Sequence, residues 1–384
     1  MKWLGACLAA IALTGCGTVG STVGDWFGSN AAKEAAKPAP LPEFRPAATL
    51  AEAWRAQVGE AGSGLFQPAV GRDAVFAAGQ AGVFRLGLHN GAIAWKHESA
   101  MKLASGVASG ENLVLAATGK GDVLALDAAS GQLRWKTALS SEVAGRMVVA
   151  SGVVAVRTGD GRVHALAAAD GARKWLYTRN LPALTLRGSG GLAVRDGVLF
   201  AGFPGGKLVA LDLANGAQLW EATVALPRGA TELERVADVM GNPVVDDTRV
   251  CAVAYQGRVA CFDAKNGALL WARDTSSNSG LAMDDVNVYV ADDKDVLTAY
   301  DKATGRAVWR QDKLARRVLS VPLALGTRLV LADGQGYVHV LSADDGAFLA
   351  RAALPGPALG APVDIGPGFA VQTVKGDVVA FKLK

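Results

Sequence analysis

The chain contains 384 residues, of which 51% are hydrophobic and 19% are Asp, Glu, Lys or Arg. This composition excludes disorder over most of the length. The net charge is only +4, and Lys and Arg form no basic block, which argues against nucleic acid as a partner. Glycine accounts for 47 residues, roughly 12% against about 7% in average proteins. These glycines recur at regular intervals, so their spacing is the feature that a fold must explain.

The beginning of the chain has the features of a lipoprotein signal peptide. Lys2 supplies a basic start, residues 4–13 are apolar, and residues 13–16 have the sequence Leu-Thr-Gly-Cys. A helix over the apolar run would rise only about 15 Å, which is too short for a bilayer core of about 30 Å. The cysteine after two small residues resembles a lipobox, which implies that 1–15 is removed and Cys16 is lipidated. The alternative is an ordinary signal peptide with an incidental cysteine.

Residues 16–48 are expected to form the lipidated cysteine and a flexible tether. The segment is rich in Gly, Ser, Ala, Lys and Pro and has no apolar periodicity. Its aromatic pair at 26–27 fits either a membrane-surface contact or a plain linker. Gly17, where an aspartate would suggest retention in the inner membrane, favours the outer membrane. We therefore expect a folded domain, 49–384, that faces the periplasm from a lipid anchor.

A repeat fills the folded part of the chain. Its unit is a glycine turn, an alternating run that ends in Ala-Leu-Asp, a second turn that ends in glycine, and a tryptophan shortly after it. In one copy the alternating run covers 122–127, and Gly131 precedes Trp135. The tryptophans that end successive copies stand at positions 95, 135, 175, 220, 271 and 309, and Ala350 takes the next such position. A period of roughly 40 residues is typical of four-stranded propeller blades and too long for ankyrin or TPR units.

Strand and hairpin signals agree with the repeat. Short β-rich runs at 153–157 and 162–166 are separated by a glycine-containing turn. Asn-Gly and Asp-Gly pairs favour tight hairpins, because Asn, Asp and Gly tolerate positive φ. Such pairs occur at 90–91, 170–171, 215–216, 266–267 and 345–346.

The two ends of the folded part complete each other. Trp54 lies one repeat period before Trp95 but has no preceding strands of its own, and 375–381 has the pattern of a third strand with no tryptophan strand after it. Pairing these segments closes the ring and leaves no open edge there. We predict an all-β, eight-bladed propeller of four-stranded antiparallel blades. The blades are marked by Trp54, Trp95, Trp135, Trp175, Trp220, Trp271, Trp309 and the Ala350 position.

The Ala-Leu-Asp-x-x-x-Gly-x-x-x-Trp pattern resembles the quinoprotein (PQQ-type) propellers, in which the tryptophan packs between neighbouring blades. With the lipobox and tether in front, essentially the whole mature chain resembles the BamB lipoproteins of the outer-membrane β-barrel assembly (Bam) machinery. The resemblance implies a non-catalytic scaffold that binds a periplasmic POTRA domain of BamA within the Bam complex. It leaves open whether unfolded outer-membrane proteins bind directly.

Two consecutive steps break the spacing of the repeat. The step from each tryptophan to the turn before the next blade's second strand is mostly short, as at 95–110 and 135–152, but the steps 175–197 and 220–247 are longer. Both extra segments connect an outer strand to the next inner strand, and such connections share one face. Segments 181–188 and 227–240 combine leucines with charged residues, which suits protein recognition. The alternative is that the leucines only pack the loops onto the ring.

The resemblance implies residue roles in these segments. Leu184, Leu186 and Arg187 would contact the POTRA domain from the first segment, and Asp238 from the second. Members of the family often have another acidic residue two positions after this aspartate. Met240 stands there, which argues against an acidic contact at that position. Pairing between a POTRA strand edge and loop backbone is an alternative mode of binding.

The rival hypothesis is a PQQ-dependent periplasmic dehydrogenase on the same scaffold. Many such enzymes have adjacent cysteines at the cofactor, but here only Cys251 and Cys261 follow the leader and the lipidation site. These two flank the hairpin at 256–257 and could form a cross-strand disulfide or stay as buried thiols. We favour unpaired thiols, because cross-strand disulfide geometry is often strained.

The remaining polar residues fit structural roles. The four histidines lack the spacing of a metal site, and two of them occupy equivalent strand positions in different blades. The four histidines are His89, His97, His164 and His339, and the two at equivalent positions are His164 and His339. A glycan-binding propeller would need exposed aromatics on a loop face, whereas the tryptophans here follow the repeat. We therefore expect no catalysis, no metal and no cofactor.

Overall fold

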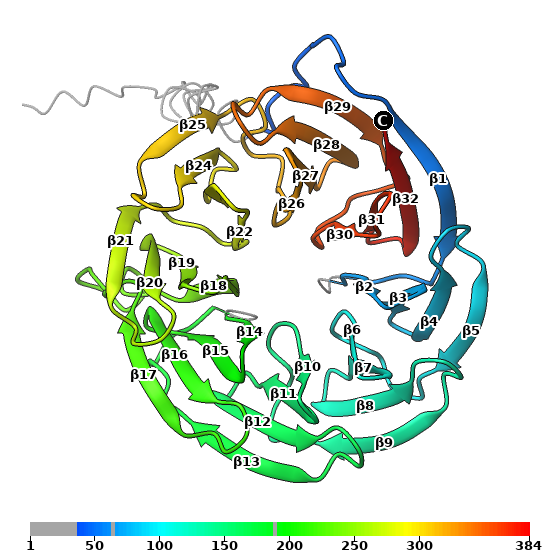
Figure 1. Cartoon of the computed structure of the whole chain (residues 1–384), viewed down its shortest axis with the longest axis vertical. Coiled ribbons are helices and arrows are strands. Elements are labelled where there is room, and N and C mark those ends of the chain that lie inside the picture. Colours follow the sequence, from blue (N-terminus) through cyan, green and yellow to red (C-terminus); the bar gives the residue numbers. More distant parts are fainter. Residues whose placement is uncertain (1–36, 63–65, 187–189) are drawn as a thin grey trace, which may run out of the picture. The chain divides into compact units, whose positions relative to one another are not determined.

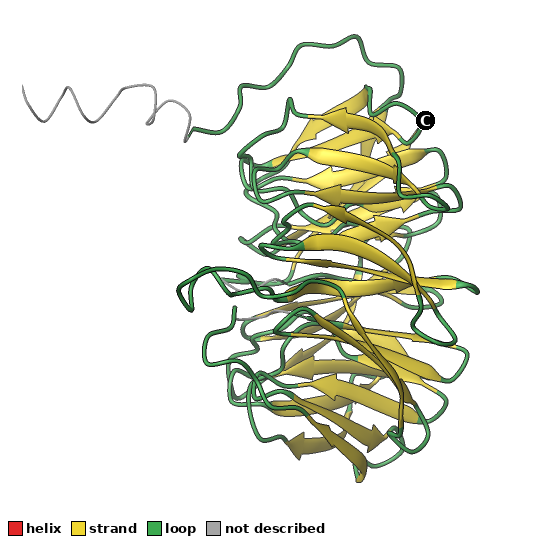
Figure 2. Cartoon of the chain, turned by 90° about the vertical axis from the view of Figure 1, so that its left-hand side faces the viewer, coloured by secondary structure: helices red, strands yellow, loops and turns green. Residues whose placement is uncertain are grey.

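A computed structural model describes residues 37–62, 66–186 and 190–384. The signal peptide, Cys16 and most of the expected tether lie outside the described residues. Ala39–Lys384 form one compact unit, a ring of eight four-stranded antiparallel sheets (Figures 1 and 2). Among the described residues, no helix is long and apolar enough to cross a bilayer. The predicted all-β, eight-bladed propeller is confirmed.

The first four blades follow one another along the chain, and within each the strands run from the centre outward as inner, second, third and outer strand. Blade 1 comprises β2 (Ala69–Val70), β3 (Ala74–Gly79), β4 (Gly82–Gly87) and β5 (Ile93–Glu98). Blade 2 comprises β6 (Ala108–Gly110), β7 (Leu113–Ala117), β8 (Asp122–Asp127) and β9 (Leu133–Ala138). Blade 3 comprises β10 (Val148–Ala150), β11 (Val153–Arg157), β12 (Arg162–Ala167) and β13 (Arg173–Thr178). Blade 4 comprises β14 (Leu192–Arg195), β15 (Val198–Phe203), β16 (Lys207–Asp212) and β17 (Gln218–Thr223).

The next three blades repeat this order, and the eighth takes its outer strand from the beginning of the chain. Blade 5 comprises β18 (Val239–Val245), β19 (Arg249–Ala254), β20 (Arg258–Asp263) and β21 (Leu269–Asp274). Blade 6 comprises β22 (Leu281–Met283), β23 (Asn287–Ala291), β24 (Leu297–Asp301) and β25 (Ala307–Gln311). Blade 7 comprises β26 (Leu323–Leu325), β27 (Arg328–Ala332), β28 (Tyr337–Ser342) and β29 (Phe348–Ala353). Blade 8 comprises β30 (Val363–Asp364), β31 (Gly368–Gln372), β32 (Asp377–Leu383) and β1 (Leu50–Gln57).

The ring closes by pairing the two ends of the folded unit, as predicted. Strand β1 runs antiparallel to β32 over its full length, and just beyond it Thr49 and Lys384 exchange two backbone hydrogen bonds of 2.9 and 3.0 Å. A buried side chain adds a link from blade 8 to blade 1, because Gln372 Nε2 donates to the Ala78 carbonyl at 2.7 Å. The closing contacts therefore join residues from opposite ends of the chain.

The tryptophan–glycine spacing sets the junctions between blades. Gly171 adopts φ +73° in the third-to-outer turn of blade 3, and a Cβ added there would lie 2.6 Å from the Trp135 ring. The Trp135 indole N–H donates to the Ala168 carbonyl in the same turn at 2.9 Å. Glycine is therefore required both for its backbone conformation and for the close approach of the indole. Corresponding contacts place Trp54 on Gly91, Trp95 on Gly131, Trp175 on Gly216, Trp220 on Gly267, Trp271 on Gly305 and Trp309 on Gly346.

Ala350 replaces the tryptophan at the one junction that has no such turn. The third and outer strands of blade 8 come from opposite chain ends, so no hairpin glycine faces β29. Ala350 is buried, and Ala48 and Leu50 from the start of the ring pack in the same apolar cluster. The missing tryptophan is thus a consequence of how the ring closes.

Residues 39–46, which we call the strap, pack on blade 7. The backbone N–H of Ala39 donates at 2.9 Å to the carbonyl of Ala315, in the connection from β25 of blade 6 to β26 of blade 7. Arg317 Nη1 donates to the Ala39 carbonyl at 2.9 Å, and Arg351 Nη1 donates to the Pro42 carbonyl at 3.1 Å. The last part of the expected tether is therefore held against the ring, and the compact unit begins before the predicted boundary at residue 49.

A buried polar network supports the strap from below. Asp333 accepts hydrogen bonds from Arg317 Nε at 2.7 Å and from His339 Nε2 at 2.9 Å, while His339 Nδ1 accepts from Arg351 Nε at 3.3 Å. The neutral imidazole with its proton on Nε2 satisfies both neighbours. Burial lowers the pKa of His339, although the hydrogen bond and charge of Asp333 oppose this shift. The Arg351 guanidinium also lies 4.9 Å from the centre of the Phe44 ring.

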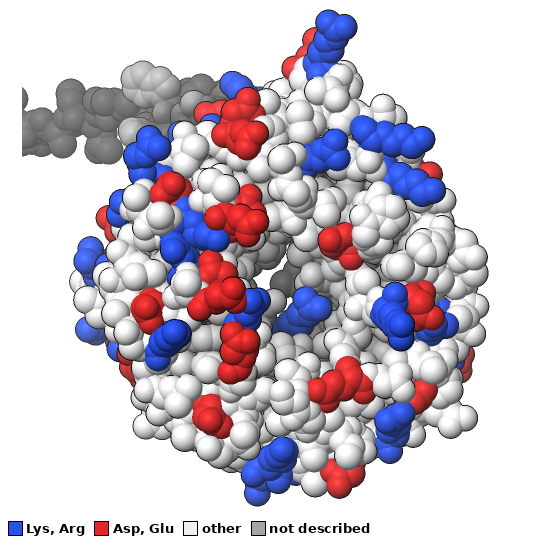
Figure 3. All heavy atoms as spheres, in the orientation of Figure 1, with Lys and Arg blue, Asp and Glu red and all other residues white. Residues whose placement is uncertain are grey.

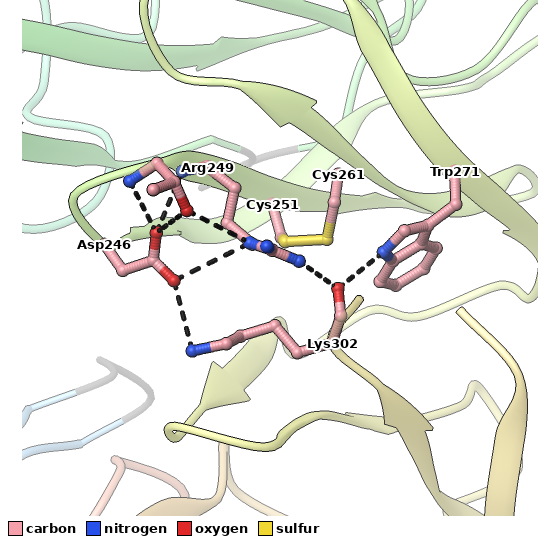
Figure 4. Close-up of a disulfide and its surroundings, with 7 residues drawn as sticks. Asp246, Arg249, Cys251, Cys261, Trp271 and Lys302 are labelled. Carbon is pink, nitrogen blue, oxygen red and sulfur yellow. Dashed lines mark hydrogen bonds and ion pairs between the residues drawn. A yellow bond between two sulfur atoms is a disulfide. The ribbon is translucent and has the colours of Figure 1, made fainter. Parts of the chain in front are cut away.

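Cys251 and Cys261 form a disulfide between β19 and β20 (Figure 4). The expectation of unpaired thiols is wrong, because the strand register places these residues directly opposite each other with a Cα–Cα distance of 4.0 Å. Both cysteines are fully buried in the cluster that contains Trp271. Beside them, the Lys302 carbonyl of blade 6 accepts hydrogen bonds from the Trp271 indole and from Arg249. The disulfide is therefore part of the core of blade 5.

Candidate partner-docking site

The two longest connections between blades are adjacent on the ring. Residues 179–191, here loop A, join β13 to β14, and residues 224–238, here loop B, join β17 to β18. Each is longer than every other connection from an outer strand to the next inner strand, the longest of which are 58–68 and 312–322. Because strands alternate in direction, all these connections lie on one face. The structure thus confirms the two enlarged loops and their common face.

Loop A presents a leucine to solvent. Leu184 is 42% exposed and Leu186 is half-buried, while Arg187 lies outside the described residues. The loop begins at Arg179, which forms two hydrogen bonds of 2.5 and 3.3 Å with the Glu221 carboxylate on the outer strand of blade 4. Loop A is therefore tied to the neighbouring blade before it reaches the exposed leucine.

Asp238 at the end of loop B lies inside the protein. Its carboxylate accepts hydrogen bonds from the backbone N–H of Leu186 at 2.6 Å and of Gly205 at 3.1 Å. Burial raises the pKa of Asp238, and these hydrogen bonds together with the charge of Arg157 act in the opposite direction. The carboxylate joins loop A to loop B and has no exposed surface. Its contribution to partner binding stays a prediction, and the geometry favours support of loop A over direct contact.

A hydrogen-bonded turn forms the tip of loop B. The Glu234 carboxylate accepts from the N–H groups of Ala230 and Thr231 at 2.8 and 3.2 Å, and Thr231 Oγ1 accepts from the Glu234 N–H at 3.3 Å. This reciprocal pattern is that of a capping box. The backbone hydrogen bonds lower the pKa of Glu234. The turn holds Leu233 outward with 68% of its surface exposed.

Two apolar contact candidates in loop B were not singled out from the sequence. Leu226 and Leu233 are 60% and 68% exposed, more than Leu184. Both leucines lie among proline, arginine and glutamate residues, which is the pattern of a surface loop. Sequence alone does not distinguish an exposed leucine in such a loop from a packed one. Met240 is buried in β18 opposite Val253, so the structure assigns it to the core.

Charge of both signs is mixed on one face of the ring. On the face shown in Figure 3, Lys and Arg lie interspersed with Asp and Glu around a central opening. The tip of loop B has the same mixed character, since Glu232 and Arg235 flank Leu233 and lie 3.8 Å apart at their charged groups. Apolar contacts with a charged surround, rather than a field of one sign, are what these loops offer to a partner.

Comparison with known proteins places the chain in a family. A sequence profile described as "Outer membrane protein assembly factor BamB" matches residues 79–311 and 293–384. The chain belongs to the BamB family. A Burkholderia pseudomallei protein with that same description is 42% identical over 348 residues, which cover 90% of this chain and 91% of the relative. The resemblance inferred from the repeat and the lipobox is confirmed.

Solved structures agree with this assignment. The crystal structure of BamB from Moraxella catarrhalis matches with a TM-score of 0.80 and 26% identity, covering 87% of this chain and all of that one. A quinohemoprotein alcohol dehydrogenase from Comamonas testosteroni matches with a TM-score of 0.71 but only 13% identity, covering 87% of this chain and 76% of the enzyme. The likeness to the dehydrogenase shows a shared fold alone.

Proposed function

We propose that this chain is a non-catalytic scaffold of the Bam complex that binds the periplasmic POTRA domain of BamA through loops A and B. Membership in a family of outer-membrane protein assembly factors supports this function. The observation that carries the site is the exposure of Leu184, Leu226 and Leu233 on two adjacent loops that a buried carboxylate joins. Apolar anchors on a supported backbone are suited to protein recognition.

The anchor belongs to the same proposal. Lipidation of Cys16 would attach the protein to the outer membrane, and the remaining tether would let the ring face the periplasm. The strap then fixes where the tether leaves the ring, namely at blade 7. Binding of BamA, of other Bam components and of unfolded outer-membrane proteins would thus take place at the periplasmic side.

Catalysis is not part of the proposed function. The two described cysteines are ten residues apart in sequence and cross-link neighbouring strands within a core, which is a structural position. The likeness to the quinohemoprotein enzyme, at 13% identity, is one of fold alone. We propose that the propeller makes and breaks no bond and acts by holding its partner.

The test is the affinity of the purified lipoprotein in detergent for BamA. Leu184→Glu and Leu233→Glu each place a charge where we propose an apolar contact. We expect each to weaken binding about 10- to 100-fold, which corresponds to about 1.4–2.8 kcal/mol. The matched control is Leu133→Glu, because Leu133 is 47% exposed on the outer strand of blade 2, away from both loops.

The control separates a docking site from general surface effects. If Leu133→Glu binds like the wild type while both loop variants bind weakly, the site stands. Wild-type affinity in both loop variants, each with an unchanged melting temperature, would overturn it.

A further inference from the structure

Arg157 breaks the repeat inside the core of blade 3. It occupies the second-strand position that pairs with the first large apolar residue of the third strand, here Val163. Six of the seven other blades have a small or apolar residue there, and blade 8 has a glutamine. The equivalent residues are Ala78, Ala117, Gly202, Val253, Ala291, Ala332 and Gln372. The propeller fold therefore does not need a charge at this position.

The Arg157 side chain points from the core toward loop A. It is only 2% exposed, and its guanidinium carbon lies 5.1 Å from the centre of the buried Phe203 ring. Its Nη1 donates to the carbonyl of Gly190 in loop A at 3.0 Å. Gly190 adopts φ +73°, so this point of the loop has a conformation that other residues rarely adopt.

Arg157 and Asp238 each bind one of the two described parts of loop A, which are residues 179–186 and 190–191. Asp238 binds the N–H of Leu186, and Arg157 binds the carbonyl of Gly190. The two side chains also interact electrostatically, because the charge of Asp238 raises the pKa of Arg157 against the stronger lowering effect of burial. A carboxylate and a guanidinium buried near each other are costly to desolvate, and in some proteins such charges are retained because they specify a conformation.

We propose that Arg157 is a positioning residue for partner binding: with Asp238, it fixes loop A from inside the ring so that Leu184 is presented to the partner. This inference rests on the proposed docking function of loops A and B. Arg157 has no surface to offer a partner, so it acts through the loop alone. A core residue that departs from the repeat thus supports a loop that also departs from it.

The experiment measures BamA affinity and melting temperature for Arg157→Gln in the full lipoprotein. Glutamine fits this repeat position, because blade 8 has one there. We expect affinity to fall about tenfold while unfolding stays cooperative. Arg157→Lys keeps the positive charge beside Asp238, and we expect it to recover affinity to within about threefold of the wild type.

Gln372→Met provides the matched control. Gln372 occupies the equivalent position, is also 2% exposed, and also donates to a backbone carbonyl of the next blade, but it lies far along the ring from loop A. We expect this variant to lower the melting temperature and leave BamA affinity unchanged. Equal losses of affinity in Arg157→Gln and Gln372→Met would show general destabilisation and overturn the proposal.

Leu184→Glu, measured alongside, separates this inference from the proposed function. Weak binding by Leu184→Glu together with wild-type binding by Arg157→Gln would overturn the positioning role and leave the docking site intact. Wild-type binding by a folded Leu184→Glu would instead remove the contact at Leu184 on which the inference rests, and with wild-type binding by Leu233→Glu as well it would remove the docking site. Hydrogen exchange at the Leu186 amide gives a second readout, and we expect it to be faster in Arg157→Gln and unchanged in Gln372→Met.

Discussion

The seven tryptophan–glycine junctions bury their large apolar side chains, whereas the two enlarged loops expose theirs. At a junction such as Trp135 on Gly171, the aromatic ring packs against the glycine and its N–H donates a hydrogen bond to a backbone carbonyl. In loops A and B, leucines face solvent while a buried arginine and a buried carboxylate hold the backbone beneath them. The regular positions specify the ring, and the positions that depart from the repeat supply a surface that the ring itself does not require.

The largest expected effect comes from breaking the closure of the ring. Deletion of residues 374–384 removes β32, the strand that pairs with both β31 and β1. We expect loss of the whole fold, because the ring would then have an unpaired gap that no other strand fills. Circular dichroism during heating measures the result. A truncated chain with an unchanged cooperative transition would contradict the closure.

The next effect concerns a single junction. Gly171→Ala forces a Cβ against the Trp135 ring and also strains the backbone, and we expect a loss of about 2–4 kcal/mol in the free energy of unfolding. Gly152→Ala is the control, because Gly152 has a similar φ of +71° but no atom within 4 Å of an added Cβ. Urea unfolding compares the two variants. Equal losses would mean that the indole contact contributes nothing.

Gly171→Ala also tests whether the junctions and the loops are independent. Gly171→Ala lies in a turn on the opposite face of the ring from loops A and B. We expect its affinity for BamA to match the wild type at a temperature where both are folded. A loss of affinity would mean that junctions and loops are coupled.

The smallest effect is a pH dependence at the strap. The pKa of His339 is lower in the folded protein than in the unfolded chain. As the pH falls below about 6.5, the unfolded state therefore binds more protons than the folded state does. The stability that neutral His339 supports is therefore present above this pH and lost on acidification. Urea unfolding at pH 7.5 and 5.5 should show a smaller difference for His339→Gln than for the wild type.

His89→Gln is the control for this prediction, because His89 is exposed in blade 1. We expect its pH dependence to match that of the wild type. A His339→Gln variant with the full wild-type pH dependence would show that the network around Asp333 does not control it.

Much of the fold could be predicted from the sequence because the blades follow from the spacing of residues that lie close together in the chain. The distance from Trp95 to Trp135 and the Asp170-Gly171 turn each depend on a few neighbouring residues. The strap could not be predicted in this way. Arg317 and Arg351 bind carbonyls that are 278 and 309 residues away in sequence, and a proline-rich segment without such partners has the pattern of a linker.

The candidate site shows the same limit. The lengths of loops A and B were evident from the broken spacing, but the burial of Asp238 depends on how two loops meet in space. The disulfide likewise depended on register, since one residue of slippage would have placed Cys251 and Cys261 on opposite faces of the sheet. Arg157 was visible as an exception only once the strand pairing aligned the eight blades.

The contact between loops A and B and BamA can be tested by photo-crosslinking in cells. A photoreactive amino acid would replace Leu184, Leu233 or, as the control, Leu133 in the full-length lipoprotein. We expect crosslinks to the POTRA region of BamA from positions 184 and 233 and none from position 133. Crosslinks from position 133 alone, or none to BamA from either loop in a protein that is folded and anchored, would contradict the proposed contact.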